Sequence, residues 1–222
     1  MHSAMNIILA GSLAGLAIAG TTTTINQNLD KSAGFELVAV VTNPATDLTP
    51  SINFWTLSTI HDGAGRAVAG LSNDAASVWY LNGTENQIKD YESSLLTDAG
   101  TPPFPNGLDF VYTPSGTADL RVDAGPGTPG VGLNQNRDLF YLSAPGNDGT
   151  YMACRESIPY YSGKEFIVLK YAYHGVPQGC AEIRLVPQCA ELAPLPPNAL
   201  ASHEYAMPVP CHVSVEAWET SA

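Results

Sequence analysis

Basic residues are scarce in this 222-residue chain. It has 9 Lys and Arg against 21 Asp and Glu, so its net charge is −12 with histidine neutral. Sites that grip phosphate backbones depend on clustered Lys and Arg, and the scarcity therefore argues against a nucleic-acid partner. Charged residues are also few, at 14%, whereas apolar residues reach 45%. This balance excludes a disordered chain and predicts a globular body with a substantial core.

No apolar run is long enough to span a bilayer, which takes about 20 residues. The longest, Ile7 to Ala19, has 13 residues and ends in Ala17-Ile18-Ala19. These features predict a signal peptide over residues 1–19 that is cut before Gly20, although no Lys or Arg precedes the run. A buried N-terminal helix is the alternative, and Met5 is a second candidate start. We expect a mature chain that is secreted, either extracellular or in the cell wall, and not membrane-bound.

The four cysteines, Cys154, Cys180, Cys189 and Cys211, contain no C-x-x-C pair, so a zinc site is disfavoured. In an oxidising compartment they predict two disulfides, for which three pairings exist. The sequence favours Cys154–Cys180 and Cys189–Cys211, each stabilising by about 3 kcal/mol on the chain-entropy model. Asn82-Gly83-Thr84 is a glycosylation sequon in a turn-like context, which makes Asn82 the expected acceptor.

Short apolar or β-branched runs alternate with turns rich in Gly and Pro. This pattern predicts an all-β fold, a single antiparallel sandwich or barrel over residues 20–222 with long Gly/Pro loops. Residues 20–32 are expected to be a loose lead-in and 220–222 a frayed end. The expected strands are Phe35–Val41, Ile52–Ser58, Ala67–Leu71, Ser77–Leu81, Leu108–Tyr112, Leu120–Asp123, Leu139–Ser143, Thr150–Cys154, Glu165–Tyr173, Ala181–Val186 and Cys211–Trp218.

Three segments have their own predictions. Glu165–Tyr173 is apolar on both faces for most of its length, which is typical of a central strand. Asn86–Asp98 suits a short helix or a strand equally well. Leu192–Asn198 (LAPLPPN) suits neither, and we expect a rigid arm there.

Catalytic motifs are largely absent. No G-x-S-x-G occurs outside the signal region and no H-E-x-x-H occurs at all. The histidines of the mature chain, His61, His174, His203 and His212, are too dispersed to indicate a metal site. His61-Asp62-Gly63 is read as a hairpin turn in preference to a general base. No cofactor or metal is therefore expected.

Carboxylate pairs leave a glycoside hydrolase open as an alternative, since such enzymes set two carboxyl groups across a cleft. The pairs close in sequence are Asp90/Glu92, Asp119/Asp123 and Glu216/Glu219. Solvated surface is the default interpretation of each. The segment Asn134–Asp138 resembles the start of a calcium loop, but Leu139 replaces the required glycine and excludes an EF-hand.

Aromatic residues offer a third possibility, a sugar-stacking platform. The candidates are Trp55, Trp79, Tyr80, Tyr160 and Tyr161. Core packing explains most aromatics on strands. Tyr160 and Tyr161 follow Pro159 in an expected turn and are the better candidates for contact with a sugar.

The C-terminal arrangement Tyr151-Met152-Ala153-Cys154, followed by the segment from Gly179 to Pro187 (GCAEIRLVP), carries a resemblance. On these residues the chain resembles an uncharacterised family of small fungal secreted proteins and, more distantly, phialide-type fungal cell-wall proteins. The resemblance implies an extracellular or wall-associated β-sandwich in which Cys154 and Cys180 are paired. It carries no catalytic residue, and the bridge that it implies is only the one between Cys154 and Cys180.

Together these features favour a secreted, non-enzymatic protein that is extracellular or associated with the cell wall. Its expected partners are cell-wall polysaccharide or a host surface protein. A carbohydrate-active hydrolase with paired carboxylates and a carbohydrate-binding module with an aromatic platform are the alternatives. The oligomeric state stays open.

Overall fold

The fold is seen in a computed structural model that describes residues 28–219. The expected signal peptide, residues 20–27 of the expected lead-in and the end at 220–222 lie outside the described residues. Nearly all regular structure in residues 28–219 is β. No helix in this part of the chain is long and apolar enough to cross a membrane.

The strands are β1 Leu29–Ser32, β2 Gly34–Val41, β3 Thr56–Gly63, β4 Arg66–Ser72, β5 Tyr80–Asn82, β6 Ser94–Ala99, β7 Phe104–Tyr112, β8 Thr117–Ala124, β9 Leu133–Asn136, β10 Leu139–Leu142, β11 Thr150–Ile158, β12 Lys164–Ala172, β13 Cys180–Ala190 and β14 Val209–His212. The helices are α1 Glu85–Lys89 and α2 Val215–Glu219, with 3₁₀ turns η1 Pro44–Thr46 and η2 Pro159–Tyr161.

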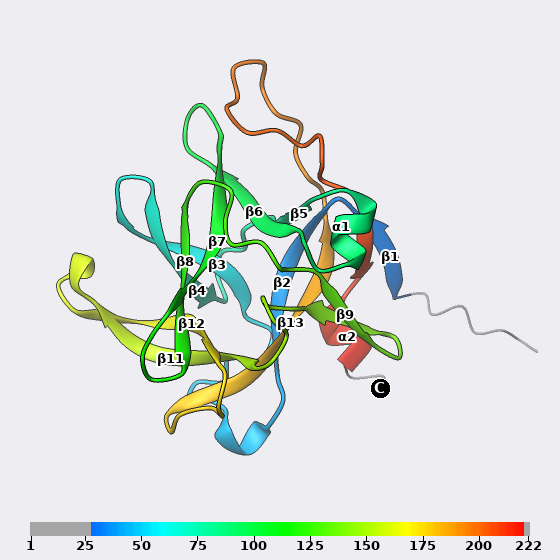
Figure 1. Ribbon diagram of the computed structural model, residues 1–222. Helices are drawn as coiled ribbons and strands as arrows, with labels where there is room; N and C mark the ends of the chain where they lie inside the picture. The colour runs from blue at the N-terminus through cyan, green and yellow to red at the C-terminus, as the bar shows by residue number, and fades with distance from the viewer. Residues whose placement is uncertain (1–27, 220–222) are drawn as a thin grey trace, which may run out of the picture.

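The main sheet closes on itself. Its pairings run β2–β13–β11–β12–β8–β7–β6–β5. A backbone bridge between Trp79, just before β5, and Phe35 on β2 completes the ring. Figure 1 looks into the space that these strands surround. The fold is therefore the barrel-like form of the expected all-β domain.

The core fills this ring. Trp79, Phe35 and Leu169 are fully buried there, and the Trp79 indole N–H donates to the carbonyl of Leu57 at 3.3 Å. The predicted central strand is confirmed, because β12 buries Val168 on one face and Leu169 on the other. Burial of aromatic and branched side chains on both sides of the strands supplies most of the driving force for this architecture.

Both predicted disulfides form, and both involve β13. Cys154 and Cys180 are directly opposed on β11 and β13, against a second apolar cluster outside the ring. Cys189 joins the end of β13 to Cys211 on β14. The two bridges therefore fix both ends of one 11-residue strand.

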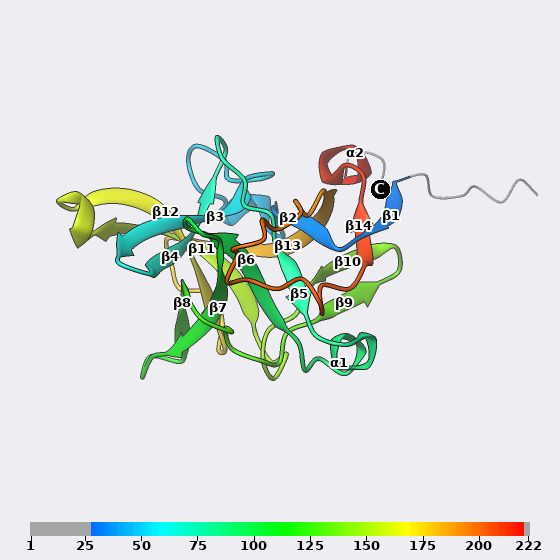
Figure 2. The ribbon, with the colours of Figure 1, turned by 90° about the horizontal axis from the view of Figure 1, so that it is seen from above.

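The terminal edge, which we define as β1, β14 and α2, differs from expectation. Leu29–Ser32 was expected to be loose but pairs antiparallel with β14. The expected strand Cys211–Trp218 ends at His212, because the Ser214 hydroxyl accepts from the Ala217 amide and begins α2. β13 and β14 pair in parallel, so the sheet is mixed and not purely antiparallel. Figure 2 places this edge on the side of the molecule opposite β3, β4 and β12.

Two other segments correct the expected strands. Residues 52–55 form a turn instead of opening a strand, because Phe54 has a positive φ of 65° and the Asn53 side chain takes the hydrogen bond of the Val41 amide. Asn86–Asp98 contains both expected alternatives, with α1 followed by β6. The expected arm has neither helix nor strand, and residues 191–208, called the arm below, extend from the body between β13 and β14.

Candidate ligand site

One hollow of the described residues is a partly apolar groove of 490 Å³, called the apolar groove below. It lies beside the terminal edge, between α1, the β9–β10 hairpin and the segment that leads from the arm into β14. Its apolar walls include Ile88, Tyr91, Leu133, Phe140 and Met207. The charged side chains that line it are Lys31, Glu85 and Lys89.

Local sequence builds the α1 wall. Thr84 and Gln87 form a reciprocal capping box that starts the helix. Tyr91 then adopts a left-handed conformation with φ 58°, which is uncommon for an aromatic residue. Gly132 lets the ring lie close, because a Cβ there would stand 3.0 Å from the Tyr91 ring and 2.9 Å from the Ile88 carbonyl oxygen. The groove therefore depends on a glycine opposite a strained tyrosine.

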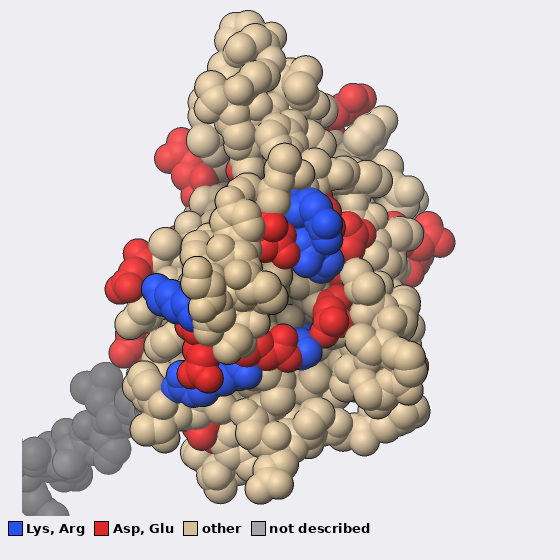
Figure 3. Space-filling view, turned by 90° about the vertical axis from the view of Figure 1, so that its left-hand side faces the viewer, with Lys and Arg blue, Asp and Glu red and all other residues tan. Residues whose placement is uncertain are grey.

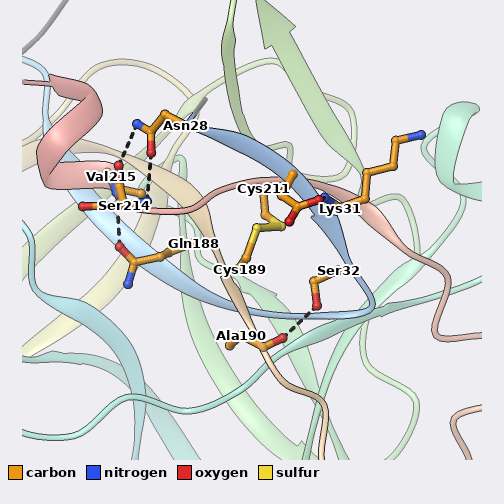
Figure 4. The surroundings of a disulfide bond; sticks show 10 residues. Asn28, Lys31, Ser32, Gln188, Cys189, Ala190, Cys211, Ser214 and Val215 are labelled. Atoms are coloured by element: carbon orange, nitrogen blue, oxygen red, sulfur yellow. Dashed lines mark hydrogen bonds between the residues drawn. A yellow bond between two sulfur atoms is a disulfide. The ribbon is translucent and has the colours of Figure 1, made fainter. Parts of the chain in front are cut away.

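The Cys189–Cys211 disulfide (Figure 4) fixes the opposite wall of the groove. Pro210, which lines that wall, directly precedes Cys211. Around it, the Asn28 side chain exchanges two hydrogen bonds with the backbone of Ser214, at 2.8 and 3.0 Å. The Ser32 hydroxyl donates to the carbonyl of Ala190 at 2.8 Å. Figure 4 shows Lys31 extending away from these contacts, on the groove side of β1.

The arm is anchored to the ring by a polar cluster. An Asp98 carboxylate oxygen lies 2.6 Å from His203 Nε2, and the other accepts from the Tyr80 hydroxyl at 3.1 Å. The Tyr80 and His203 rings meet edge to face, 5.0 Å between centroids. Burial raises the pKa of Tyr80 well above its usual range, and the negative charge of Asp98 adds to this. The cluster holds the arm, and through it the groove wall, in place.

A second, smaller hollow of 200 Å³ is mainly polar. Tyr141 lies in its wall under the Arg184 guanidinium, 5.2 Å from its carbon to the ring centroid. Glu182 accepts a hydrogen bond from the Thr150 hydroxyl at 3.1 Å. The amides of Asn134 and Asn147, also in the wall, pair with each other. The charged and amide side chains in this wall can recognise a small polar ligand.

Ion pairs gather on the face that carries β4, β8, β11 and β12, where Figure 3 shows basic side chains flanked by acidic ones. Arg121 binds Asp62 through two hydrogen bonds, at 2.8 and 3.1 Å, and also contacts Asp123. The hydrogen bonds from Arg121 lower the pKa of Asp62. We call this row of charges the belt. Asp62 therefore pairs with Arg121, and the hairpin turn lies just beyond His61-Asp62-Gly63, at Ala64-Gly65.

The belt also contains a carboxylate pair that sequence spacing did not reveal. Asp119 and Glu156 line a hollow of 110 Å³, and both form ion pairs with the Lys170 ammonium. A glycosidase needs the space between its carboxylates for the scissile bond. Here the lysine ammonium occupies it.

The three carboxylate pairs near in sequence lie apart from this hollow or are already engaged. Asp123 contacts Arg121, and Asp90 caps the end of α1. Glu219, at the end of α2, accepts from the Asn53 side chain at 3.1 Å. Within residues 28–219, no three His, Cys, Asp or Glu side chains are grouped to hold a metal ion.

Tyr160 and Tyr161 are exposed in η2, with exposed fractions of 58% and 37%. Their rings lie at 73° to each other, so the two do not form one flat surface. The more nearly parallel pair is Tyr112 and Tyr173, at 28°. Tyr112 ends β7 and Tyr173 follows β12, and both of these strands pair with β8. Of the other aromatic candidates, Trp79 and Tyr80 are buried in the core.

Asn82 is half-buried at the end of β5, where its backbone bridges to Ala206 of the arm. The hydroxyl of Thr84, the third residue of the sequon, caps α1. Glycosylation of Asn82 stays a prediction.

His212 is fully buried against Trp218, and neither ring nitrogen has a hydrogen-bond partner among the described residues. Burial lowers its pKa.

Sequence reasoning did not find the groove. Its residues come from β1, α1, β10 and the end of the arm, which are far apart along the chain, and no short motif connects them. One local signal was present, since Thr84-x-x-Gln87 is a capping box that marks the start of α1.

Two comparisons relate the chain to known proteins. The family model of a domain of unknown function, DUF7907, matches residues 32–189. The antigenic protein SchS34 of Stachybotrys chartarum is 38% identical over 200 residues, which cover 84% of this chain and 88% of that protein. No solved structure matches. Neither comparison links the chain to phialide-type wall proteins, so that resemblance stays a prediction.

Proposed function

This chain belongs to the DUF7907 family, and from that premise we propose that it is exported from a fungal cell and acts outside it, at a wall or host surface, by binding and not by catalysis. The observation that carries the proposal is the pair of disulfides that fix both ends of β13. Disulfides persist in oxidising compartments and are rare in the cytosol. The name of the antigenic relative is compatible with export.

The signal-like segment makes export testable. The full chain is expressed in a filamentous fungus with a C-terminal tag, and medium, wall and cell fractions are analysed by mass spectrometry. We expect a chain that begins at Gly20, outside the cell, with no free thiol. Leu13→Arg/Leu16→Arg, which puts charges in the apolar run, should stay inside the cell. A wild-type chain that stays inside with its N-terminus intact and its thiols free would contradict export.

Binding without catalysis is tested on the secreted protein. We expect it to sediment with insoluble wall polysaccharides or to bind host cell surfaces, and to release no new reducing ends from a glycan panel. Turnover that Asp119→Asn/Glu156→Gln abolishes would establish the hydrolase alternative instead. Turnover that survives this change would still contradict the non-enzymatic proposal.

Carbohydrate binding is the second candidate, and the polar hollow beside Tyr141 favours it. Arg184, Glu182 and two amides supply donors and acceptors for the hydroxyl groups of a sugar. Arg184→Gln/Glu182→Gln should then weaken polysaccharide binding about tenfold, whereas Tyr160→Ala/Tyr161→Ala tests the exposed tyrosines of η2. If neither double variant changes sedimentation, the carbohydrate candidate is wrong.

A further inference from the structure

Some of the apolar side chains that line the groove are not used by the folded core. Phe140 and Met207 are half-buried and belong to none of the apolar clusters formed by the described residues. Tyr91 lies beside them with 40% of its surface exposed. Leaving this much apolar surface in contact with water is unfavourable, and concave apolar surfaces of this kind commonly mark a binding site.

The groove is also held in shape before any ligand arrives. Tyr91 is fixed by its left-handed backbone and by close contact with Gly132. The opposite wall is tied by the Cys189–Cys211 disulfide and by the contact of His203 with Asp98. A pre-organised site loses less entropy when a ligand binds. The volume of 490 Å³ lies within the roughly 300–1,000 Å³ typical of small-molecule sites.

The charge at its rim is opposite to that of the whole chain. Two of only 9 basic residues, Lys31 and Lys89, line the groove with one carboxylate, Glu85. Lys89 pairs with Glu85 at 2.9 Å. Within residues 28–219, no carboxylate forms an ion pair with the Lys31 ammonium. In a protein of net charge −12, this local excess of positive charge favours an anion.

We propose that this groove binds an amphipathic carboxylate with a long apolar tail, of the fatty-acid type. The tail lies along Phe140 and Met207, and the carboxylate meets Lys31 and Lys89. The lining argues for an alkyl tail, because the groove that holds the two lysines is also lined by Ile88, Leu133, Phe140, Met207 and Val209. The inference rests on the binding part of the proposed function. A protein that binds laurate but stays inside the cell would contradict export alone.

Head-group selectivity tests the charge argument. Full-length protein is titrated by calorimetry, below the micelle concentration, with laurate, dodecyltrimethylammonium and dodecyl maltoside, whose alkyl tails are nearly equal in length. We expect laurate to bind best. Lys31→Gln/Lys89→Gln should weaken the binding of laurate about five- to tenfold and leave the binding of the maltoside unchanged. The reason is that each exposed ion pair contributes up to about fivefold to the affinity. Lys164→Gln, on β12, is the matched control.

The apolar wall is tested by Phe140→Ser. This substitution should weaken the binding of laurate and of the maltoside equally, by about tenfold. Tyr112→Ser is its control, since Tyr112 is 61% exposed on β7. The proposal is wrong if laurate does not bind, or if Phe140→Ser leaves its binding intact. It is also wrong if all three probes bind equally and the double lysine variant does not change their binding. Dimerisation of the wild type that Phe140→Ser abolishes would also overturn it, because the groove would then be an interface.

Discussion

The ring of strands and the terminal edge are stabilised in different ways. In the ring, β11 and β12 pair along nine positions and β13 and β2 along eight, over a core of fully buried aromatic and branched side chains. At the terminal edge, β1 and β14 pair along four positions, and β14 meets β13 at one. A disulfide and a few side-chain hydrogen bonds supply the rest. The edge and the arm are therefore easier to perturb locally, and they form a wall of the groove.

The largest expected effect is in the ring. Trp79→Ala removes the buried indole of a residue whose backbone closes the ring against Phe35. This change should lower the free energy of unfolding by about 3–5 kcal/mol. Phe140→Ala in the groove should cost only about 1 kcal/mol, because that ring is half-buried and outside the core clusters. Urea unfolding measures both. Equal losses of unfolding free energy in the two variants would contradict the claim that the ring is the more stabilising region.

The disulfides sharpen the comparison. Cys154→Ser/Cys180→Ser and Cys189→Ser/Cys211→Ser should each cost about 3 kcal/mol, since they open loops of similar length, 26 and 22 residues. Only the second pair of substitutions should also abolish laurate binding, because only that bridge fixes a groove wall. The measurements are urea unfolding and calorimetric titration. Loss of laurate binding in Cys154→Ser/Cys180→Ser alone would contradict the claim that the Cys189–Cys211 bridge is the one that fixes a groove wall.

The anchor of the arm should have a smaller effect. His203→Ala removes the contact with Asp98 and should cost about 1.5 kcal/mol, as expected for a hydrogen bond to a charged group. Hydrogen exchange should accelerate at Leu200 and Ala201, whose amides bond to the Pro103 carbonyl. His174→Ala, at an exposed histidine elsewhere, is the control. Unchanged protection of the arm would show that this contact does not anchor it.

The smallest effect is a pH dependence at the terminal edge. Burial lowers the pKa of His212 in the folded chain, so the unfolded chain binds more protons below its own pKa of about 6.5. Stability contributed by neutral His212 is complete above that pH and is lost as the pH falls toward the folded pKa.

His212→Phe should reduce this loss by an amount on the order of 1 kcal/mol between pH 7 and pH 5. Urea unfolding at several pH values measures it. An unchanged pH profile in the variant would mean that His212 is not the responsible group.

The parts that follow local patterns were predictable from sequence. A run that is apolar on both faces identified the central strand Glu165–Tyr173, and the expected pairing of Cys154 with Cys180 is confirmed. Other parts depend on distant partners. Leu29–Ser32 is too polar to indicate a strand and becomes one only because β14 offers it an edge. The groove combines Lys31 with Phe140 across more than 100 residues, a juxtaposition that the sheet topology alone creates.

The most direct test of the account is a chemical-shift map of the uniformly labelled protein titrated with laurate. The central claim is that the groove beside the terminal edge is the ligand site. We predict saturable shifts at Ile88, Leu133, Met207 and Val209, which line it, and none at Val68 or Leu120, which line the belt hollow. Shifts confined to the polar hollow around Tyr141, or no saturable shift at all, would contradict the claim.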